Sequence, residues 1–275
     1  MGGGTYSYIT AVNRSKDVYS VKSREEIFRQ SSLNPEMDIR KKSIRESRDS
    51  EEHPNSFPII IGLDETGSMG KIPESLIKRT FPDIIKAIMD AGIEHPQVCF
   101  CAFGDGQNLN EQAAIQVGEF ESSDELMEKW LKAVYLEGMG AGNGAEDAEL
   151  VWYVAANHMQ TDSFEKRGKK GVLITISDEP VHRHVSRKMI NHYIGDTPEK
   201  DLVISEILEK ASEAWDIYHI HIEHGSYRLG ETNWEQLLDS NVIATEANWE
   251  DEIKRIIPNL VIGSYNSFND LVEAG

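Results

Sequence analysis

The chain has 275 residues, of which 39% are hydrophobic and 27% charged, a composition typical of a globular protein. No apolar run approaches the ~20 residues that a membrane-spanning helix requires, so we expect no membrane-embedded segment. The net charge is −19: residues 1–57 hold ten Lys/Arg and nine Asp/Glu and contribute +1, which leaves −20 on the remainder. This acidic body argues against nucleic acid as a partner, because phosphate binding depends on Lys and Arg.

Residues 1–56 differ in composition from the rest of the chain. Polar and charged residues are frequent there, apolar residues are scattered, and the segment ends in a polar, proline-containing linker from Ser47 to Ser56. We interpret residues 1–56 as an extended arm or loosely packed extension, and residues 57–275 as one domain. We expect Arg45 and Arg48 to be solvated, with packing on the acidic body as the alternative. The start, Met1–Ser7, lacks the basic and apolar regions of a signal peptide, so we expect a cytoplasmic protein.

From residue 57 onwards, strand-like and helix-like patterns alternate. Short apolar runs predict strands at 58–63, 97–103, 114–120, 171–177, 216–222 and 242–245, the third at an edge or in a hairpin. Apolar spacing predicts helices near 76–88, 126–134, 146–159, 197–215, 233–238 and 250–261. Pro82 should break or kink the first of these, and Thr197-Pro198 should open the fourth. This alternation predicts an α/β fold with a Rossmann-like, mostly parallel central sheet and helices on both faces.

Cysteine and histidine residues give no recognisable metal-binding spacing. Cys99 and Cys101 lie two apart on one predicted strand, where a disulfide is sterically poor, and we interpret them as buried hydrophobic residues. His219 and His221 share a strand face, and packed or surface roles are expected for them. His182 and His184 follow the 171–177 strand and are candidates for the border of a binding site.

Three polar segments lie where ligands bind in open parallel sheets, just beyond the carboxyl ends of strands. Asp64 to Gly70 follows the first strand, Asp178-Glu179-Pro180 follows the 171–177 strand, and a glycine-rich loop, 138–144, enters a helix. Asp64, Thr66 and Ser68 alternate on a tight turn that Gly67 permits, so their oxygens can point to one side. Oxygen ligands of this kind suit a hard cation such as Mg²⁺, with Mn²⁺ and Ca²⁺ as alternatives.

An apolar strand followed by Asp-x-Thr-Gly-Ser-Met resembles the metal-ion-dependent adhesion site (MIDAS) of von Willebrand factor A domains. The resemblance implies a von Willebrand factor A-like fold over 57 to about 265, with Asp64 acting through water and Thr66 and Ser68 binding the ion directly. The family's later aspartate matches Asp178. The family also supplies a Thr from its second loop, but no Thr lies between Thr80 and Thr161. Asn143 is the best positional match, and Glu146 is a second candidate ligand, or else stabilises the start of its helix.

These observations favour a cation-dependent protein-binding module over an enzyme. In the family, a partner's carboxylate completes the metal shell, and we expect such a partner here. A haloacid dehalogenase-like phosphohydrolase is the first alternative, but Thr66 stands where that class carries its proton-donating second Asp. The second alternative is a structural assembly protein whose metal site is lost, with residues 1–56 as an interaction arm.

Overall fold

The computed structural model describes residues 3–107, 109, 111–136, 144–223, 226–246 and 248–274, without the side chains of residues 68, 70 and 269–274. Six strands form the central sheet: β2 (Phe57–Asp64), β3 (Pro96–Phe103), β4 (Ile115–Val117), β6 (Gly171–Ser177), β9 (Trp215–Ile222) and β10 (Val242–Thr245). Their order is β10-β9-β6-β2-β3-β4, and only β4 runs antiparallel to its neighbour. The prediction of a mostly parallel sheet is therefore confirmed.

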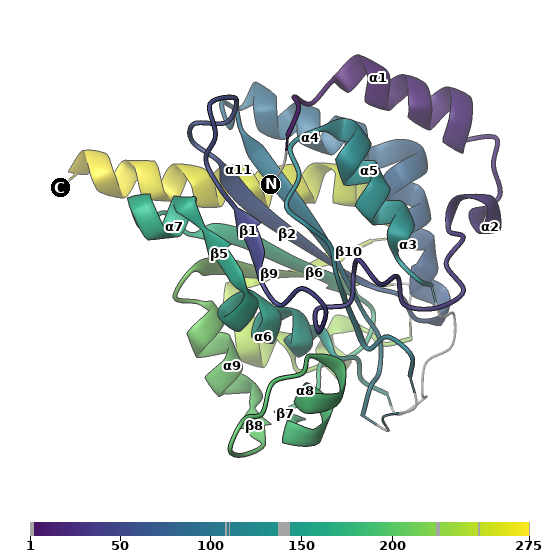
Figure 1. Ribbon diagram of the computed structural model, residues 1–275, viewed down its shortest axis with the longest axis vertical. Helices are drawn as coiled ribbons and strands as arrows, with labels where there is room; N and C mark the ends of the chain where they lie inside the picture. The colour runs from purple at the N-terminus through teal and green to yellow at the C-terminus, as the bar shows by residue number, and fades with distance from the viewer. Residues whose placement is uncertain are drawn as a thin grey trace.

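Helices cover both faces of this sheet, as the prediction required (Figure 1). One face carries α3 (Lys71–Ser75), α4 (Phe81–Asp90), α5 (Asp124–Ala133) and α11 (Trp249–Ala274). The other carries α6 (Ala148–His158), α8 (Arg187–Tyr193), α9 (Ile204–Ala211) and α10 (Trp234–Leu238). Of the described helices, none is long and apolar enough to cross a membrane.

Side chains of β2 alternate between these two layers and so set the direction of Asp64. Ile59, Ile61 and Leu63 belong to the core beneath α4 and α11, whereas Ile60 belongs to the core beneath α6. At Gly62 an added Cβ would already lie 3.4 Å from Val151 of α6, so glycine permits the close approach of helix and sheet. Because alternate residues share a face, Asp64 points to the α6 side of the sheet.

The chain reverses its direction of travel across the sheet between β2 and β6. It moves outward from β2 to β3 and β4, and then returns to β6 on the other side of β2. Such a reversal is the switch point at which open α/β sheets bind ligands, beyond the carboxyl ends of the strands. β2 and β6 pair in parallel with Leu63 opposite Ile176, so Asp64, the last residue of β2, and Asp178, the first residue after β6, lie at the same ends of adjacent strands.

Residues 3–56 are packed against the rest of the molecule. The segment contains α1 (Tyr8–Asn13), a π-helical turn at Arg14–Tyr19, α2 (Arg24–Ile27) and β1 (Arg45–Ser47). β1 pairs in parallel with β5 (Met159–Thr161) in a separate two-stranded sheet, and β5 leads into α7 (Asp162–Arg167). The extension also buries apolar side chains in the two cores, among them Tyr19, Ile27, Phe28, Met37 and Ile39.

Arg45 and Arg48 are not solvated, so the first expectation for them is wrong and the alternative, that they pack on the body of the protein, is correct. Arg45 is fully buried, and its guanidinium donates to the carbonyl oxygens of Val117 and Gly118 next to β4. Val117 in turn donates its N–H to the carbonyl of Met37, so the extension lies along the outer side of β4. Arg48 binds Asp162 at 3.0 Å and Glu165 of α7. Carbonyl and carboxylate acceptors that are distant in sequence hold these two arginines in place.

One helix prediction needs correction, and another is confirmed. The helix expected from Thr197-Pro198 begins only at Ile204, where the Glu206 side chain accepts the N–H of Val203. A short strand, β8 (Leu202–Val203), precedes the helix and pairs with β7 (His184–Val185). The helix near 76–88 is interrupted beside Pro82, as predicted: a π-helical turn covers Leu76–Thr80, and α4 starts at Phe81 with Pro82 in its first turn, where a missing N–H costs nothing.

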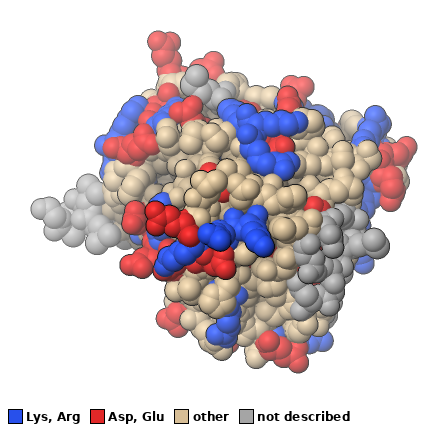
Figure 2. Space-filling model, turned by 60° about the horizontal axis from the view of Figure 1, so that its bottom comes forward, with Lys and Arg blue, Asp and Glu red and all other residues tan. Residues whose placement is uncertain are grey.

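Charge is distributed in small groups rather than in one field on the face drawn in Figure 2. Basic and acidic side chains alternate there between larger neutral areas, although the net charge of the chain is −19. Seven of the carboxyl groups are instead buried inside the protein, because Asp64, Glu65, Asp105, Glu146, Asp147, Glu149 and Asp178 are each less than a tenth exposed. We call these seven residues the acidic cluster.

Candidate metal centre

Asp64 ends β2 and is fully buried. Its Oδ1 accepts hydrogen bonds from the backbone N–H and the hydroxyl of Thr66, at 2.8 and 2.6 Å. Gly67 has a φ of +28°, the region that glycine tolerates, as the turn in the sequence predicted. Asp64 Oδ2 is buried without a hydrogen-bond partner. The turn therefore fixes the carboxylate and leaves one of its oxygens available.

Asp178 and Glu179 follow β6, the neighbour of β2. Asp178 is buried, its Oδ2 accepts the N–H of Ser226, and its carbonyl accepts that of Tyr227 at 3.2 Å. The pKa of Asp64 is raised well above its usual value by burial, and the negative charges of Asp178 and Glu179 raise it further. The two predicted aspartates thus lie close enough to repel each other when both are ionised.

Glu146 lies in the segment before α6, and its side chain approaches Asp64 and Glu179 at the ends of β2 and β6. Its N–H donates to the carbonyl of Pro180 at 2.9 Å, which ties the segment before α6 to the loop after β6. α6 begins two residues later, at Ala148. Glu146 Oε2 is buried without a partner, and burial followed by the charges of Asp64 and Glu179 raises the pKa of Glu146 to about 11.

The structure therefore brings Asp64, Thr66, Glu146 and Asp178 to the carboxyl ends of β2 and β6. The side chain of Ser68 and the whole of Asn143 lie outside the described residues, so their predicted roles as ligands stay predictions. The identity of Asp64, Thr66, Glu146 and Asp178 as metal ligands is likewise a prediction that their placement makes geometrically feasible.

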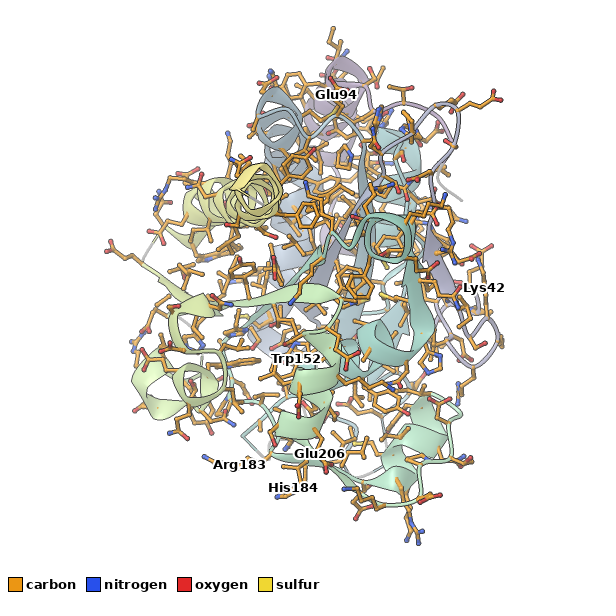
Figure 3. All side chains as sticks on the ribbon, turned by 90° about the vertical axis from the view of Figure 1, so that its left-hand side faces the viewer. Lys42, Glu94, Trp152, Arg183, His184 and Glu206 are labelled. Atoms are coloured by element: carbon orange, nitrogen blue, oxygen red, sulfur yellow. The ribbon has the colours of Figure 1, made fainter. Side chains whose placement is uncertain are left out.

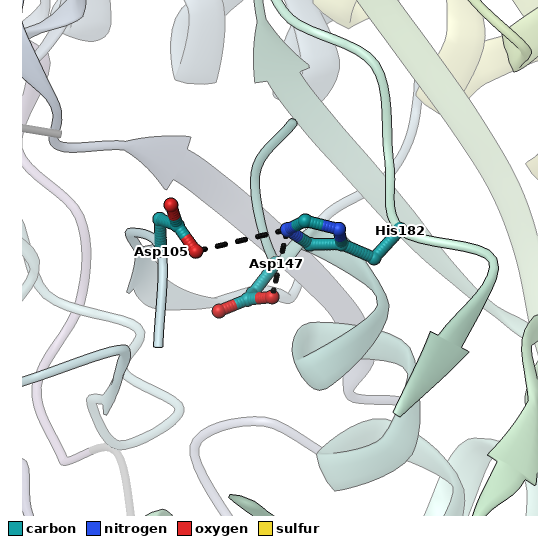
Figure 4. Close-up of side chains that lie close together, drawn as sticks. All are labelled: Asp105, Asp147 and His182. Atoms are coloured by element: carbon teal, nitrogen blue, oxygen red, sulfur yellow. Dashed lines mark ion pairs between the residues drawn. The ribbon is translucent and has the colours of Figure 1, made fainter. Parts of the chain in front are cut away.

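A further group of side chains was missed by the sequence analysis. Asp105 follows β3, Asp147 precedes α6, and His182 lies in the loop after β6 (Figure 4). His182 Nε2 is 3.7 Å from Asp105 Oδ1 and 3.6 Å from Asp147 Oδ1. One potential ligand atom from each lies within 4.8 Å of the other two. Asp105 carried a usable signal, because it follows a buried strand just as Asp64 does.

His184, in contrast, does not share this position. It is exposed in β7 and projects near the edge of the molecule with Arg183 (Figure 3). Of the two histidines expected at the border of the site, only His182 is beside the acidic cluster.

His219 and His221 pack in the core, as the sequence indicated. The ring of His219 stacks on Trp234 at 3.5 Å, and its Nδ1 lies 3.0 Å from the Thr175 hydroxyl. Trp234 in turn packs edge-on against Trp152. Burial lowers the pKa of both His219 and His221. Cys99 and Cys101 are likewise buried free thiols, which confirms their interpretation as hydrophobic residues.

The chemistry of the acidic cluster is that of a cation site. Burial raises the pKa values of Asp64, Asp147, Glu146 and Glu149, and neighbouring carboxylates raise them further. A divalent cation would replace the protons that these groups otherwise retain, and would give partners to the unpaired oxygens of Asp64 and Glu146.

Comparisons with known proteins identify the fold but not a family. No family model and no curated protein matches the sequence. The chain is similar to the solved structure of the pilus adhesin SpaC from Lactobacillus rhamnosus GG in its open conformation, with a TM-score of 0.54 and 10% identity, covering 82% of this chain and 31% of that one. This similarity supports the α/β fold.

Two further solved structures are similar at lower scores. One is a von Willebrand factor type A protein from Catenulispora acidiphila, with a TM-score of 0.46 and 12% identity, covering 76% of this chain and 43% of that one. The other is proximal thread matrix protein 1 from the mussel byssus with a zinc-occupied MIDAS motif, with a TM-score of 0.44 and 12% identity, covering 78% and 49%. The chain thus spans between about a third and a half of the lengths of these proteins.

Proposed function

We propose that this protein is a divalent-cation-dependent protein-binding module of the von Willebrand factor A type. The cation, Mg²⁺ or a similar hard ion, is held by Asp64, Thr66, Ser68 and Asp178, with Glu146 or Asn143 completing the protein ligands. The observation that carries the proposal is the pair of buried oxygens, Asp64 Oδ2 and Glu146 Oε2, that have no hydrogen-bond partner at the switch point of the sheet. A bound cation gives both a partner.

Binding of a partner follows from the coordination that the protein leaves open. Mg²⁺ prefers about six oxygen ligands and usually keeps some as exchangeable water. A carboxylate from a partner can replace one of these waters, which couples capture of the partner to the presence of the ion. The similarity in fold to a pilus adhesin is consistent with a binding role.

The structure favours this function over phosphate ester hydrolysis. In a haloacid dehalogenase-like enzyme, the residue two positions after the nucleophile donates a proton to the leaving group. Here that residue is Thr66, whose hydroxyl donates its hydrogen bond to Asp64 itself. A threonine hydroxyl in this arrangement supports a carboxylate that binds a cation and is a poor general acid.

The test separates cation binding from partner binding. Calorimetric titration with Mg²⁺ should show binding to the wild type that is lost in Asp64→Asn, which keeps the shape of the side chain and removes its charge. Glu94→Gln is the matched control, because Glu94 is exposed just before β3, at the opposite ends of the strands (Figure 3). Glu94→Gln should bind Mg²⁺ like the wild type.

Partner binding is then tested with a displayed library of random peptides. Panning in Mg²⁺ should enrich peptides that share an Asp or Glu, and this enrichment should disappear with a chelator or with Asp64→Asn. Equal enrichment in a chelator would overturn the proposed function, as would Mg²⁺ binding that survives Asp64→Asn unchanged.

A further inference from the structure

We propose that Asp105, Asp147 and His182 form a second cation site, beside the first, that takes a late first-row ion such as Zn²⁺ or Co²⁺. The three residues come from three different connections: the end of β3, the segment before α6 and the loop after β6. None of them belongs to the ligand set of the site proposed above. The inference therefore does not depend on the proposed function.

The two carboxylates are oriented by the backbone and each keeps a free oxygen. Asp147 Oδ2 accepts the N–H of Gly106, and Asp105 Oδ1 accepts the N–H of Gln107 at 3.2 Å. Asp147 Oδ1 and Asp105 Oδ2 are buried without a hydrogen-bond partner. Both aspartates are about 1% exposed or less, so solvent does not supply the missing partners.

His182 lies beside both carboxylates but forms a hydrogen bond with neither of them. Its Nε2 lies 3.6 and 3.7 Å from the two carboxylate oxygens, which is too long for a hydrogen bond to either of them. The same Nε2 has no hydrogen-bond partner. Two atoms without a hydrogen-bond partner, Asp147 Oδ1 and His182 Nε2, therefore face each other between three loops, and Asp105 Oδ1, which also accepts the Gln107 N–H, lies 3.7 Å from the same nitrogen (Figure 4).

The spacing and the donor types indicate which ions fit. Zn²⁺ binds imidazole nitrogen and carboxylate oxygen at about 2.0–2.2 Å in a tetrahedron, which places neighbouring ligand atoms about 3.3 Å apart. The separations of 3.6 and 3.7 Å need only small movements to reach this value. An imidazole ligand favours Zn²⁺ or Co²⁺ over Mg²⁺, which prefers oxygen alone. Three protein ligands leave a fourth position open to water.

The experiment uses the full chain with Mg²⁺ in large excess, so that Zn²⁺ and Co²⁺ are measured at a site that Mg²⁺ does not fill. The wild type should bind one equivalent of Zn²⁺ by calorimetry, and Co²⁺ should give visible absorption bands that Zn²⁺ displaces. His182→Gln and Asp147→Asn should each weaken Zn²⁺ binding by at least tenfold.

Two control variants make the result specific. His184→Gln removes an exposed imidazole two residues further along the chain, in β7, and should bind Zn²⁺ like the wild type. Asp64→Asn should lose Mg²⁺ binding and retain Zn²⁺ binding, which separates the two sites. Circular dichroism of each variant without metal checks that it is folded. His182→Gln is the safer variant, because the His182 side chain is 17% exposed whereas Asp147 is fully buried.

Three outcomes would overturn the inference. The first is a wild type that binds no Zn²⁺ when Mg²⁺ is in excess. The second is a folded His182→Gln variant whose Zn²⁺ affinity is unchanged. The third is loss of Zn²⁺ binding in Asp64→Asn equal to that in Asp147→Asn, because the ion would then occupy the first site.

Discussion

Replacing Arg45 with methionine should destabilise the whole protein, although Arg45 lies in residues 3–56, where the apolar residues follow no regular pattern. Its guanidinium donates to the carbonyl oxygens of Val117, Gly118, Lys42 and Glu36 at 2.5–3.2 Å. Glu119 lies 3.5 Å away and supplies an opposite charge. Methionine keeps the apolar part of the side chain and removes all of these bonds.

The magnitude follows from the acceptors that the substitution leaves behind. The hydrogen bonds to Lys42 and Glu36 are only partly buried, so water can replace the guanidinium there. Those to Val117 and Gly118 are buried, and each buried carbonyl without a donor costs about 1–3 kcal/mol. The sum of roughly 2–6 kcal/mol agrees with the ~3–5 kcal/mol typical of removing one partner of a buried charged network. We expect a loss near the middle of that range.

Urea unfolding followed by tryptophan fluorescence measures this loss directly. Arg29→Met is the matched control, because Arg29 is exposed in the same segment and its side chain binds only the nearby carbonyl of Glu26 among the described contacts. The control should change the free energy of unfolding by less than about 0.5 kcal/mol. A loss below about 1 kcal/mol in Arg45→Met, or one equal to that of the control, would refute the reasoning.

Two further predictions concern other contacts. Burial raises the pKa of Asp49, but hydrogen bonds from Arg167 and Ser56 outweigh it and lower the pKa to about 2. Asp49 therefore stabilises the fold at pH values above the pKa of an unfolded Asp, and this stabilisation disappears as the pH falls from about 4 towards 2. The urea midpoint of the wild type should fall over this pH range by more than that of Asp49→Asn. Midpoints of the two proteins that fall in parallel with pH would contradict the prediction. In Gly106→Ala, the new Cβ would lie 2.5 Å from the Tyr193 ring, so the loop must move and withdraw its N–H from Asp147. Unfolding free energy should fall by about 1–3 kcal/mol and Zn²⁺ binding should weaken, whereas Gly230→Ala, whose Cβ meets no neighbour within 4 Å, should change neither.

The central sheet could be predicted because its strands are buried on both faces. Short uninterrupted runs of apolar residues, such as Ile59-Ile60-Ile61, are typical of strands that are covered on both faces of a parallel sheet. Once β2 and β6 are recognised as adjacent parallel strands, the meeting of Asp64 and Asp178 follows from topology alone. This part of the site required no knowledge of side-chain geometry.

The group formed by Asp105, Asp147 and His182 could not be predicted in the same way. Its members lie on three connections, and their meeting depends on backbone bonds such as the one from Asp147 to the carbonyl of Gly104. The same limit applies to residues 3–56, because their polar composition resembles that of a solvated arm. Their arginines are satisfied by carbonyl and carboxylate groups far along the chain, which no local pattern reveals.

The contact between residues 36–45 and β4 has a consequence for how this protein behaves at high concentration. An outer strand normally presents free N–H and C=O groups, which recruit strands from other molecules and lead to aggregation. At Val117 both groups are already used, the N–H by Met37 and the carbonyl by Arg45. Residues 36–45 thus prevent another strand from pairing with β4 at this position. A truncation that removes them would expose the backbone N–H and C=O of Val117 to strands of other molecules.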